Sequence, residues 1–241
     1  MFNLIIVKNY DEASDMAFKV MKDYLKPGKV LGLATGSSPL GLYSRMVKDH
    51  EENGTSYAEI TTFNLDEYVG LPISHPESYY AFMHRNLLDK VDIAPENTHI
   101  PSGLGDDLDA QCEAYEKMID NCPVDIQVLG IGSDGHIAFN EPGTAFDSIT
   151  HVTDLAESTI QDNCRFFEND ITKVPTQAVT QGIATIMKAK NIMLIATGEN
   201  KAKAVKAMLQ SEVSEECPAS ILQKHNSVTI ILDEAAASLL K

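Results

Sequence analysis

Long apolar runs are missing from this sequence. No stretch approaches the roughly 18 uninterrupted apolar residues that a membrane-spanning helix requires. The first residues, Met-Phe-Asn-Leu-Ile-Ile-Val-Lys, also lack the basic leader and the small-residue cleavage site of a secretory signal. The two absences argue against a membrane-spanning or secreted protein, and they predict a cytoplasmic protein without a membrane partner.

Positive charge is scarce as well. The chain has 19 Lys and Arg residues against 35 Asp and Glu residues, which gives a formal net charge of -16. Nucleic acids and anionic membrane surfaces are bound by basic patches, so this balance argues against both as partners. If the ligand is an anion, a few local groups must overcome the negative field of the whole protein.

Metal-binding, redox and nucleotide motifs are absent too. No Cys-x-x-Cys pair occurs, so neither a zinc cluster nor a redox motif is indicated. The cysteines are predicted to be reduced thiols: Cys112, Cys122, Cys164 and Cys217. The Walker pattern Gly-x-x-x-x-Gly-Lys-[Ser/Thr] is missing, and no Gly-x-Gly-x-x-Gly follows the first predicted strand, so nucleotide binding is not supported.

What is present is a regular alternation of strand and helix patterns. The 241 residues, 44% of them hydrophobic, can bury a large core, and no repeat, low-complexity segment or linker divides them. Short apolar runs predict strands at 2–7, 30–34, 60–64, 98–100, 124–131, 191–196 and 227–232. Helical patterns lie between them, among them 78–91, 106–119 and 177–189, and a short Ala-rich helix is predicted near the C-terminus. We therefore predict a single α/β domain over residues 1–241, with an open, doubly wound, mostly parallel, Rossmann-like sheet and helices on both faces.

Residues 143–176 break this alternation. They are rich in Thr, Asp and Asn and poor in aliphatic side chains, and they form the least periodic part of the chain. Such a segment next to a site is typical of a mobile lid. We predict that residues 143–176 cover the functional site.

The most informative stretch follows the predicted strand at 124–131. Glycines at 130, 132 and 135 permit sharp turns, and Asp134, His136 and Glu141 place three titratable groups just past the strand's end. Open α/β sheets bind their ligands at that end. A solvated loop is the alternative, but a carboxylate next to an imidazole fixes its tautomer and raises its basicity. We therefore interpret the cluster as an acid/base site with His136 as a proton shuttle.

A second loop has the character of a phosphate site. Thr35, Gly36, Ser37 and Ser38 connect the strand at 30–34 to a helical pattern that begins after Pro39. Free backbone N–H groups, hydroxyls and the positive end of a helix dipole suit a phosphate. An ordinary helix cap followed by proline explains the same residues, so the loop alone leaves both interpretations open.

Three further charged positions are candidates. Asp66 follows the strand at 60–64 and is a candidate base, because the sheet rule places it in the same crevice as the other two loops. Lys201 lies in the first turn of a helix, where a cation is unfavourable unless it shares an anion. Arg165 stands next to two phenylalanines in an acidic segment, and a surface salt bridge explains it equally well.

Taken together, five segments closely resemble the motifs of glucosamine-6-phosphate deaminases in order and spacing, across nearly the whole chain. They are LATGSSP at 33–39, TFNLDEYVG at 62–70, LGIGSDGHIAFNEP at 129–142, RFFEND at 165–170 and TGENK at 197–201.

The resemblance implies a reaction that needs neither cofactor nor metal. In it, glucosamine 6-phosphate and water become fructose 6-phosphate and ammonia, within amino-sugar catabolism. Asp66 matches the base that moves a proton between C2 and C1, and His136 matches the residue that opens the pyranose ring. Asp134 and Glu141 match the carboxylates that orient that histidine. The matched phosphate-binding positions are Thr35, Gly36, Ser37, Ser38, Arg165 and Lys201.

The sequence departs from the allosteric, hexameric members of that family. Residues 143–152 carry no Lys or Arg where those members have basic residues, and the longer C-terminal tail of those members is missing. We therefore predict the short, non-allosteric type, as a monomer, with a small homo-oligomer as the alternative.

Two rival functions remain. The 6-phosphogluconolactonases are similar in fold and in the Asp-Gly-His segment, but they usually have arginine after the first acidic pair and lack the Phe-Asn-Glu-Pro continuation. A phosphosugar sensor would be free to lose Asp66 or His136, and both are present.

Overall fold

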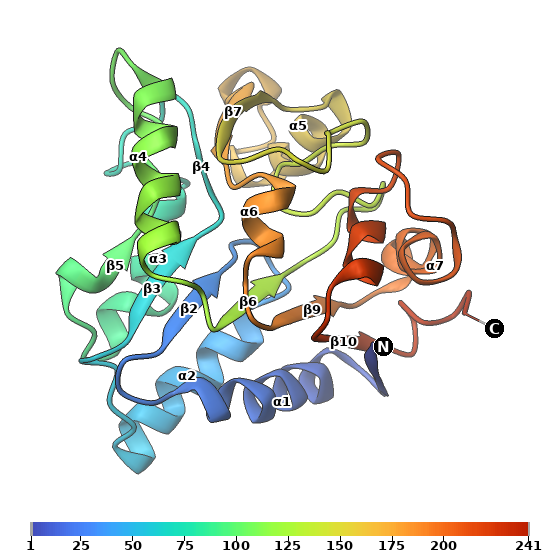
Figure 1. Cartoon of the computed structure of the whole chain (residues 1–241), viewed down its shortest axis with the longest axis horizontal. Helices are drawn as coiled ribbons and strands as arrows, with labels where there is room; N and C mark the ends of the chain where they lie inside the picture. Colours follow the sequence, from blue (N-terminus) through green and yellow to red (C-terminus); the bar gives the residue numbers. More distant parts are fainter. Residues whose placement is uncertain (1, 241) are drawn as a thin grey trace.

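The computed structural model describes residues 2–240 and contains one large parallel sheet (Figure 1). Its seven strands lie in the order β1-β10-β9-β6-β2-β3-β5, and every pair of neighbours is parallel. The central strands are buried on both faces, as their continuous apolar runs predict. The bounds are β1 Asn3–Val7, β2 Val30–Leu33, β3 Thr61–Asn64, β5 Thr98–His99, β6 Ile126–Leu129, β9 Ile192–Ala196 and β10 Val228–Asp233.

Helices cover the two faces of this sheet. Figure 1 shows α1 and α2, which pack against each other, on one face, and α4 and α6 on the other. Side-chain caps start several of them: Asn9 accepts from the N–H of Glu12 before α1, and Asp107 accepts from Ala110 before α4. The bounds are α1 Tyr10–Met21, α2 Leu40–Asn53, α3 Tyr79–Asn86, α4 Leu108–Asn121, α5 Glu157–Asn163, α6 Ile183–Met187 and α7 Ala202–Gln210. The predicted α/β class with helices on both faces is confirmed.

The strand order places a switch point between β2 and β6. From β2 the chain moves outward to β3 and β5, and it then returns through α4 to β6 on the other side of β2. The connections leaving the carboxyl ends of β2 and β6 therefore diverge and open a crevice between them. The loop at 34–39 and the loop at 130–136 both begin at this crevice.

A second, smaller sheet was not expected from the sequence. It is antiparallel, in the order β4-β8-β7, with β4 at Asp66–Tyr68, β8 at Gln177–Thr180 and β7 at His151–Asp154. The predicted helix at 177–189 is therefore wrong in its first half, because residues 177–180 pair with both β4 and β7. Only Ile183–Met187 is helical, after Gly182.

The predicted C-terminal helix is also wrong. Residues 234–239 form consecutive turns, because after one i−4 bond, from Ala237 to Asp233, the backbone continues with i−3 bonds from Ser238 to Ala235 and from Leu240 to Ala237.

The segment at 143–176 contains regular structure that its composition did not suggest, namely β7, α5 and two short 3₁₀ turns. Movement of this segment as a lid stays a prediction. Among residues 2–240, no helix is long and apolar enough to cross a membrane.

Candidate active site

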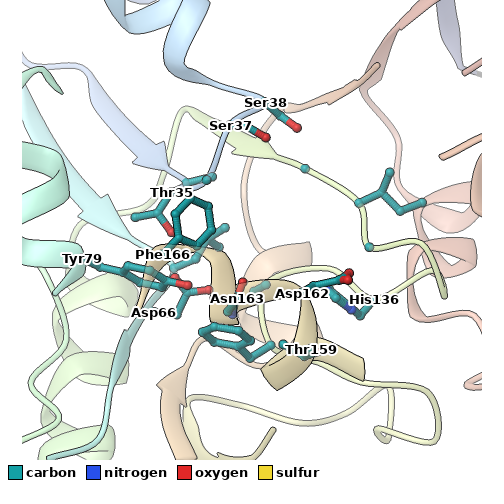
Figure 2. Close-up of a pocket in the computed structure, with 18 of the residues that line it drawn as sticks. Thr35, Ser37, Ser38, Asp66, Tyr79, His136, Thr159, Asp162, Asn163 and Phe166 are labelled. Carbon is teal, nitrogen blue, oxygen red and sulfur yellow. The ribbon is translucent and has the colours of Figure 1, made fainter. Parts of the chain in front are cut away.

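One cavity of about 350 Å³ lies at the crevice (Figure 2). Eight of the predicted site residues line it, and they come from four separate connections of the sheet: Thr35, Gly36, Ser37, Ser38, Asp66, His136, Arg165 and Lys201. Asp134 and Glu141 are outside the lining and contact His136 instead. The structure thus brings together every residue that the sequence singled out.

The loop after β2 exposes polar groups toward the cavity. Gly36 has a φ of +89°, a left-handed conformation that favours glycine, and it turns the chain so that α2 begins one residue after Pro39. Within residues 2–240, no hydrogen bond engages the backbone N–H groups of Gly36, Ser37 or Ser38. Together with the positive end of α2, these N–H groups form a site for an anion.

Two cationic side chains complete the anion-binding end of the cavity. Lys201 precedes α7, and Arg165 follows α5 with its guanidinium 4.7 Å from the ring centre of Phe166. In the described part of the chain neither residue forms a salt bridge. Burial lowers the pKa of Lys201, an effect that Asp162 and Asp134 oppose. The arrangement leaves both cations free to bind a phosphate.

Asp66 has the properties of a carboxylate base. It is only 5% exposed, and its Oδ1 has no hydrogen-bond partner among residues 2–240. Burial, together with the charge of neighbouring Glu67, raises the pKa of Asp66 to about 8, although His136 lowers it. Glu67 itself accepts backbone hydrogen bonds from Tyr79 and Tyr80, both at 2.9 Å, and so fixes the start of α3.

His136 lies opposite and is held by two carboxylates. Its Nδ1 is 2.8 Å from Asp134 Oδ1 and 3.4 Å from Glu141 Oε2. Burial lowers the pKa of the imidazole, but the hydrogen bonds and charges of both carboxylates outweigh burial and raise the pKa to about 9. The pKa of Asp134 is correspondingly depressed. His136 is therefore an imidazolium at neutral pH.

The glycine at 132 makes this arrangement sterically feasible. A Cβ at that position would collide with the imidazole of His136 and approach the carboxylate of Asp134. The close approach of the backbone to the histidine thus requires glycine. The Gly-rich pattern after β6 reflects the space that the acid/base cluster needs.

Several pocket residues escaped the sequence analysis. Tyr79 on α3 lies next to Asp66 in Figure 2, and its hydroxyl is 3.4 Å from that of Tyr68. Asn163 at the end of α5 donates to the Tyr68 hydroxyl at 2.9 Å, and Asp162, next to it in the chain, also lines the cavity (Figure 2). The 78–91 helix was assigned to the scaffold, and only the position of the tyrosine in the first turn of a helix was available as a signal.

The acid/base cluster is also the one group with metal-ligand spacing found among the described residues. Ligand atoms of Asp134, His136 and Glu141 lie within 4.8 Å of one another. Since Nδ1 of His136 lies 2.8 Å from Asp134 Oδ1 as an ion pair, the contacts within the cluster are those of a proton-transfer unit. We assign no metal to it.

Fold and site define an α/β protein that binds a small phosphorylated molecule and has acid/base groups facing it. A family model described as glucosamine-6-phosphate isomerases/6-phosphogluconolactonase matches residues 13–231. The chain belongs to this family.

Individual relatives separate the two activities in that description. The chain is 48% identical to a glucosamine-6-phosphate deaminase of Clostridium perfringens, with 99% of each chain covered. It is 46% identical to glucosamine-6-phosphate deaminase 2 of Bacillus subtilis, over 99% of this chain and 97% of the relative.

Solved structures of both kinds of protein share the fold of this chain, at different levels of sequence identity. A monomeric glucosamine-6-phosphate deaminase superposes with a TM-score of 0.96 at 44% identity, covering 98% of this chain and 99% of the other. A 6-phosphogluconolactonase from Trypanosoma brucei shares the fold, with a TM-score of 0.82 at 22% identity over 100% of this chain and 99% of that one.

Proposed function

We propose that this protein is a glucosamine-6-phosphate deaminase, which converts glucosamine 6-phosphate and water into fructose 6-phosphate and ammonia. The observation that carries the proposal is the pairing of a buried carboxylate, Asp66, with a carboxylate-held imidazolium, His136, across a cavity that ends in an anion site. The relatives of 44–48% identity that have this name support it.

In the first step, the sugar ring opens. The phosphate binds to the loop N–H groups and to Arg165 and Lys201, which fixes the sugar relative to the two acid/base groups. His136 gives a proton to the ring oxygen as the C1 hydroxyl loses one, and the open-chain aldehyde forms. Asp134 and Glu141 stabilise the imidazolium before transfer.

In the second step, the proton at C2 moves to C1. Asp66 removes the C2 proton, which the neighbouring aldehyde makes acidic, and returns it to C1. The aldehyde oxygen gains a proton and becomes the C1 hydroxyl, and the amine loses a proton, so that C2 becomes an imine. Water then adds to C2 and ammonia leaves. The burial that raises the pKa of Asp66 to about 8 strengthens it as a base for this transfer.

The test is ammonia release from glucosamine 6-phosphate by the purified protein, with hydrolysis of 6-phosphogluconolactone measured alongside. We expect prompt ammonia and no lactone hydrolysis. Lactone hydrolysis without ammonia release would mean that the protein has the other activity of the family, that of a 6-phosphogluconolactonase. If the protein binds the sugar phosphate but shows neither activity, it is a sensor.

Replacing Lys201 by Ala is expected to weaken substrate binding more than turnover. A point charge on the phosphate acts in the ground state and the transition state alike, so KM should rise by roughly tenfold or more while kcat changes little. Steady-state kinetics at constant ionic strength measures both. A fall in kcat with an unchanged KM would show that Lys201 does not bind the phosphate in the way proposed.

We also infer a monomer that acts in the cytoplasm without an allosteric activator. The related solved structure is that of a monomeric enzyme, and residues 143–152 contain no Lys or Arg for a second phosphate. Sedimentation should give the monomer mass, and the saturation curve should be hyperbolic. Sigmoidal kinetics relieved by N-acetylglucosamine 6-phosphate would contradict the inference.

A further inference from the structure

The carboxylate of Glu141 connects the catalytic histidine to helix α5. Its Oε2 lies 3.4 Å from Nδ1 of His136. Its other oxygen, Oε1, accepts from the Thr159 hydroxyl at 2.6 Å and from the backbone N–H of Ala156 at 3.3 Å. Thr159 is buried, so no solvent competes for this bond. One carboxylate therefore has its two oxygens committed to two different parts of the site.

Helix α5 depends on such contacts for its position. It has seven residues, far fewer than a helix needs to be stable alone, and its N-cap, Ala156, has no capping side chain. Glu141 takes that role at the start of the helix. At its end, Asn163 donates to the Tyr68 hydroxyl at 2.9 Å. Between and beyond these two anchors, α5 and the turn after it contribute Asp162, Arg165 and Phe166 to the cavity, among other residues.

We propose that Thr159 is a positioning residue that holds Glu141 against His136 and thereby couples the placement of α5 over the cavity to the charge of the histidine. The proposal rests on the proposed function for its catalytic consequence, while its physical basis is the hydrogen bond from Thr159. When α5 is in place, His136 has two carboxylate partners, and the segment with Arg165 is in position for the phosphate.

Other charged groups around His136 do not provide this link. Asp134 contacts the ring from its own loop, Asp66 faces it from β4, Asp162 lines the same cavity from α5, and Lys201 faces Asp134 from the turn before α7. The Cys217 thiol packs against Gly135, and burial raises its pKa. Of these groups, Glu141 alone forms an ion pair with His136 and also accepts hydrogen bonds from the start of α5.

Removing the Thr159 hydroxyl should lower the pKa of His136. Without its shortest hydrogen bond, Glu141 is free to turn away from the imidazole, and the imidazolium then loses one negative neighbour. Because one carboxylate at this distance shifts a pKa by a unit or more, we expect a downward shift of about one pH unit.

The experiment compares Thr159→Val, which keeps the shape without the hydroxyl, with Thr159→Ser, which keeps the hydroxyl. Asn163→Leu is the matched control, since it cuts the other anchor of α5 without touching Glu141. The His136 imidazole is titrated by ¹⁵N NMR, with its signal assigned by loss in His136→Gln, and the pH dependence of kcat/KM is recorded for the same proteins. Thermal unfolding verifies that each variant is folded.

We expect the His136 titration and the alkaline limb of kcat/KM to move down together in Thr159→Val and to return in Thr159→Ser. Asn163→Leu should raise KM and move the titration by clearly less than Thr159→Val does, because it keeps the Thr159–Glu141 hydrogen bond. In a Glu141→Gln background, Thr159→Val should add no further shift. An unmoved titration in folded Thr159→Val, or an equal shift in Asn163→Leu, overturns the proposal. If the wild-type protein releases no ammonia, the proposed function fails, but the NMR titration still decides the role of Thr159.

Discussion

Replacing Asp66 by Asn is expected to lower kcat by roughly 10²–10⁴-fold, the usual contribution of a general base. The substitution keeps the size and removes the group that takes the C2 proton. KM should change little, because Asp66 is not one of the groups proposed to bind the phosphate. The measurement is steady-state ammonia release together with incorporation of deuterium from solvent into fructose 6-phosphate in the presence of ammonium. The rates of ammonia release and of deuterium incorporation should fall in parallel. An unchanged rate of deuterium incorporation would show that Asp66 is not the base.

Stability provides a control for this variant. Burial raises the pKa of Asp66 from its ordinary 3.8 to about 8, so the folded state binds a proton that the unfolded state has released between these values. This group therefore makes the fold less stable as the pH rises from about 4 to about 8. The asparagine introduced by Asp66→Asn does not titrate, so this variant does not lose stability in this way. The unfolding temperature of the variant, relative to that of the wild-type protein, should therefore rise as the pH increases from about 4 to about 8. A variant that loses activity and also unfolds early would point to damaged structure instead of lost chemistry.

Replacing His136 by Gln is expected to lower kcat/KM for glucosamine 6-phosphate by roughly 10²–10⁴-fold, because ring opening then has no proton donor. Deuterium exchange into fructose 6-phosphate with ammonium should retain a larger share of its rate, since the ketose also opens in solution and the Asp66 step is intact. This contrast separates the two residues. If both rates fall equally in His136→Gln, the histidine acts in the isomerisation as well.

The pH profile of the wild-type enzyme should reflect both groups. Asp66 must be ionised to act as a base, and its pKa of about 8 predicts that kcat/KM rises with pH up to that region. His136 must be protonated to act as an acid, and its pKa of about 9 predicts a fall above that value. The expected profile is a bell with its maximum between the two values. In Asp66→Asn, the acidic limb should disappear from the residual activity.

Most of the parallel sheet followed from local patterns. The strands at 30–34 and 191–196 were predicted within a residue or two of β2 and β9, because a strand buried on both faces is expected to be a continuous apolar run. The strand at 60–64 was predicted equally well, although it contains two threonines and an asparagine. The same logic placed Asp66 and His136 at strand ends. Since parallel strands end at one edge, their convergence in one crevice was predictable without the structure.

The second sheet was not predictable in this way. Asp66 pairs with Thr180, and β8 pairs with β7, through contacts between segments far apart in the sequence. Residues 177–180 fit a helix locally, and only their two strand partners make them a strand. The Glu141–Thr159 bond arises from the same packing, since it joins the loop after β6 to a helix that its own residues cannot stabilise.

The sequence by itself determined which groups are available: a loop of small residues, two cations, and carboxylates around one histidine, all except Arg165 following the ends of strands. Only the tertiary structure decided how those groups behave. The elements packed around Asp66 remove water from it and raise its pKa, and α5, held by Glu141 and Tyr68, completes the cavity. The physical reason is that a local pattern extends over a few residues, whereas desolvation depends on everything that packs against a group, however distant in the chain.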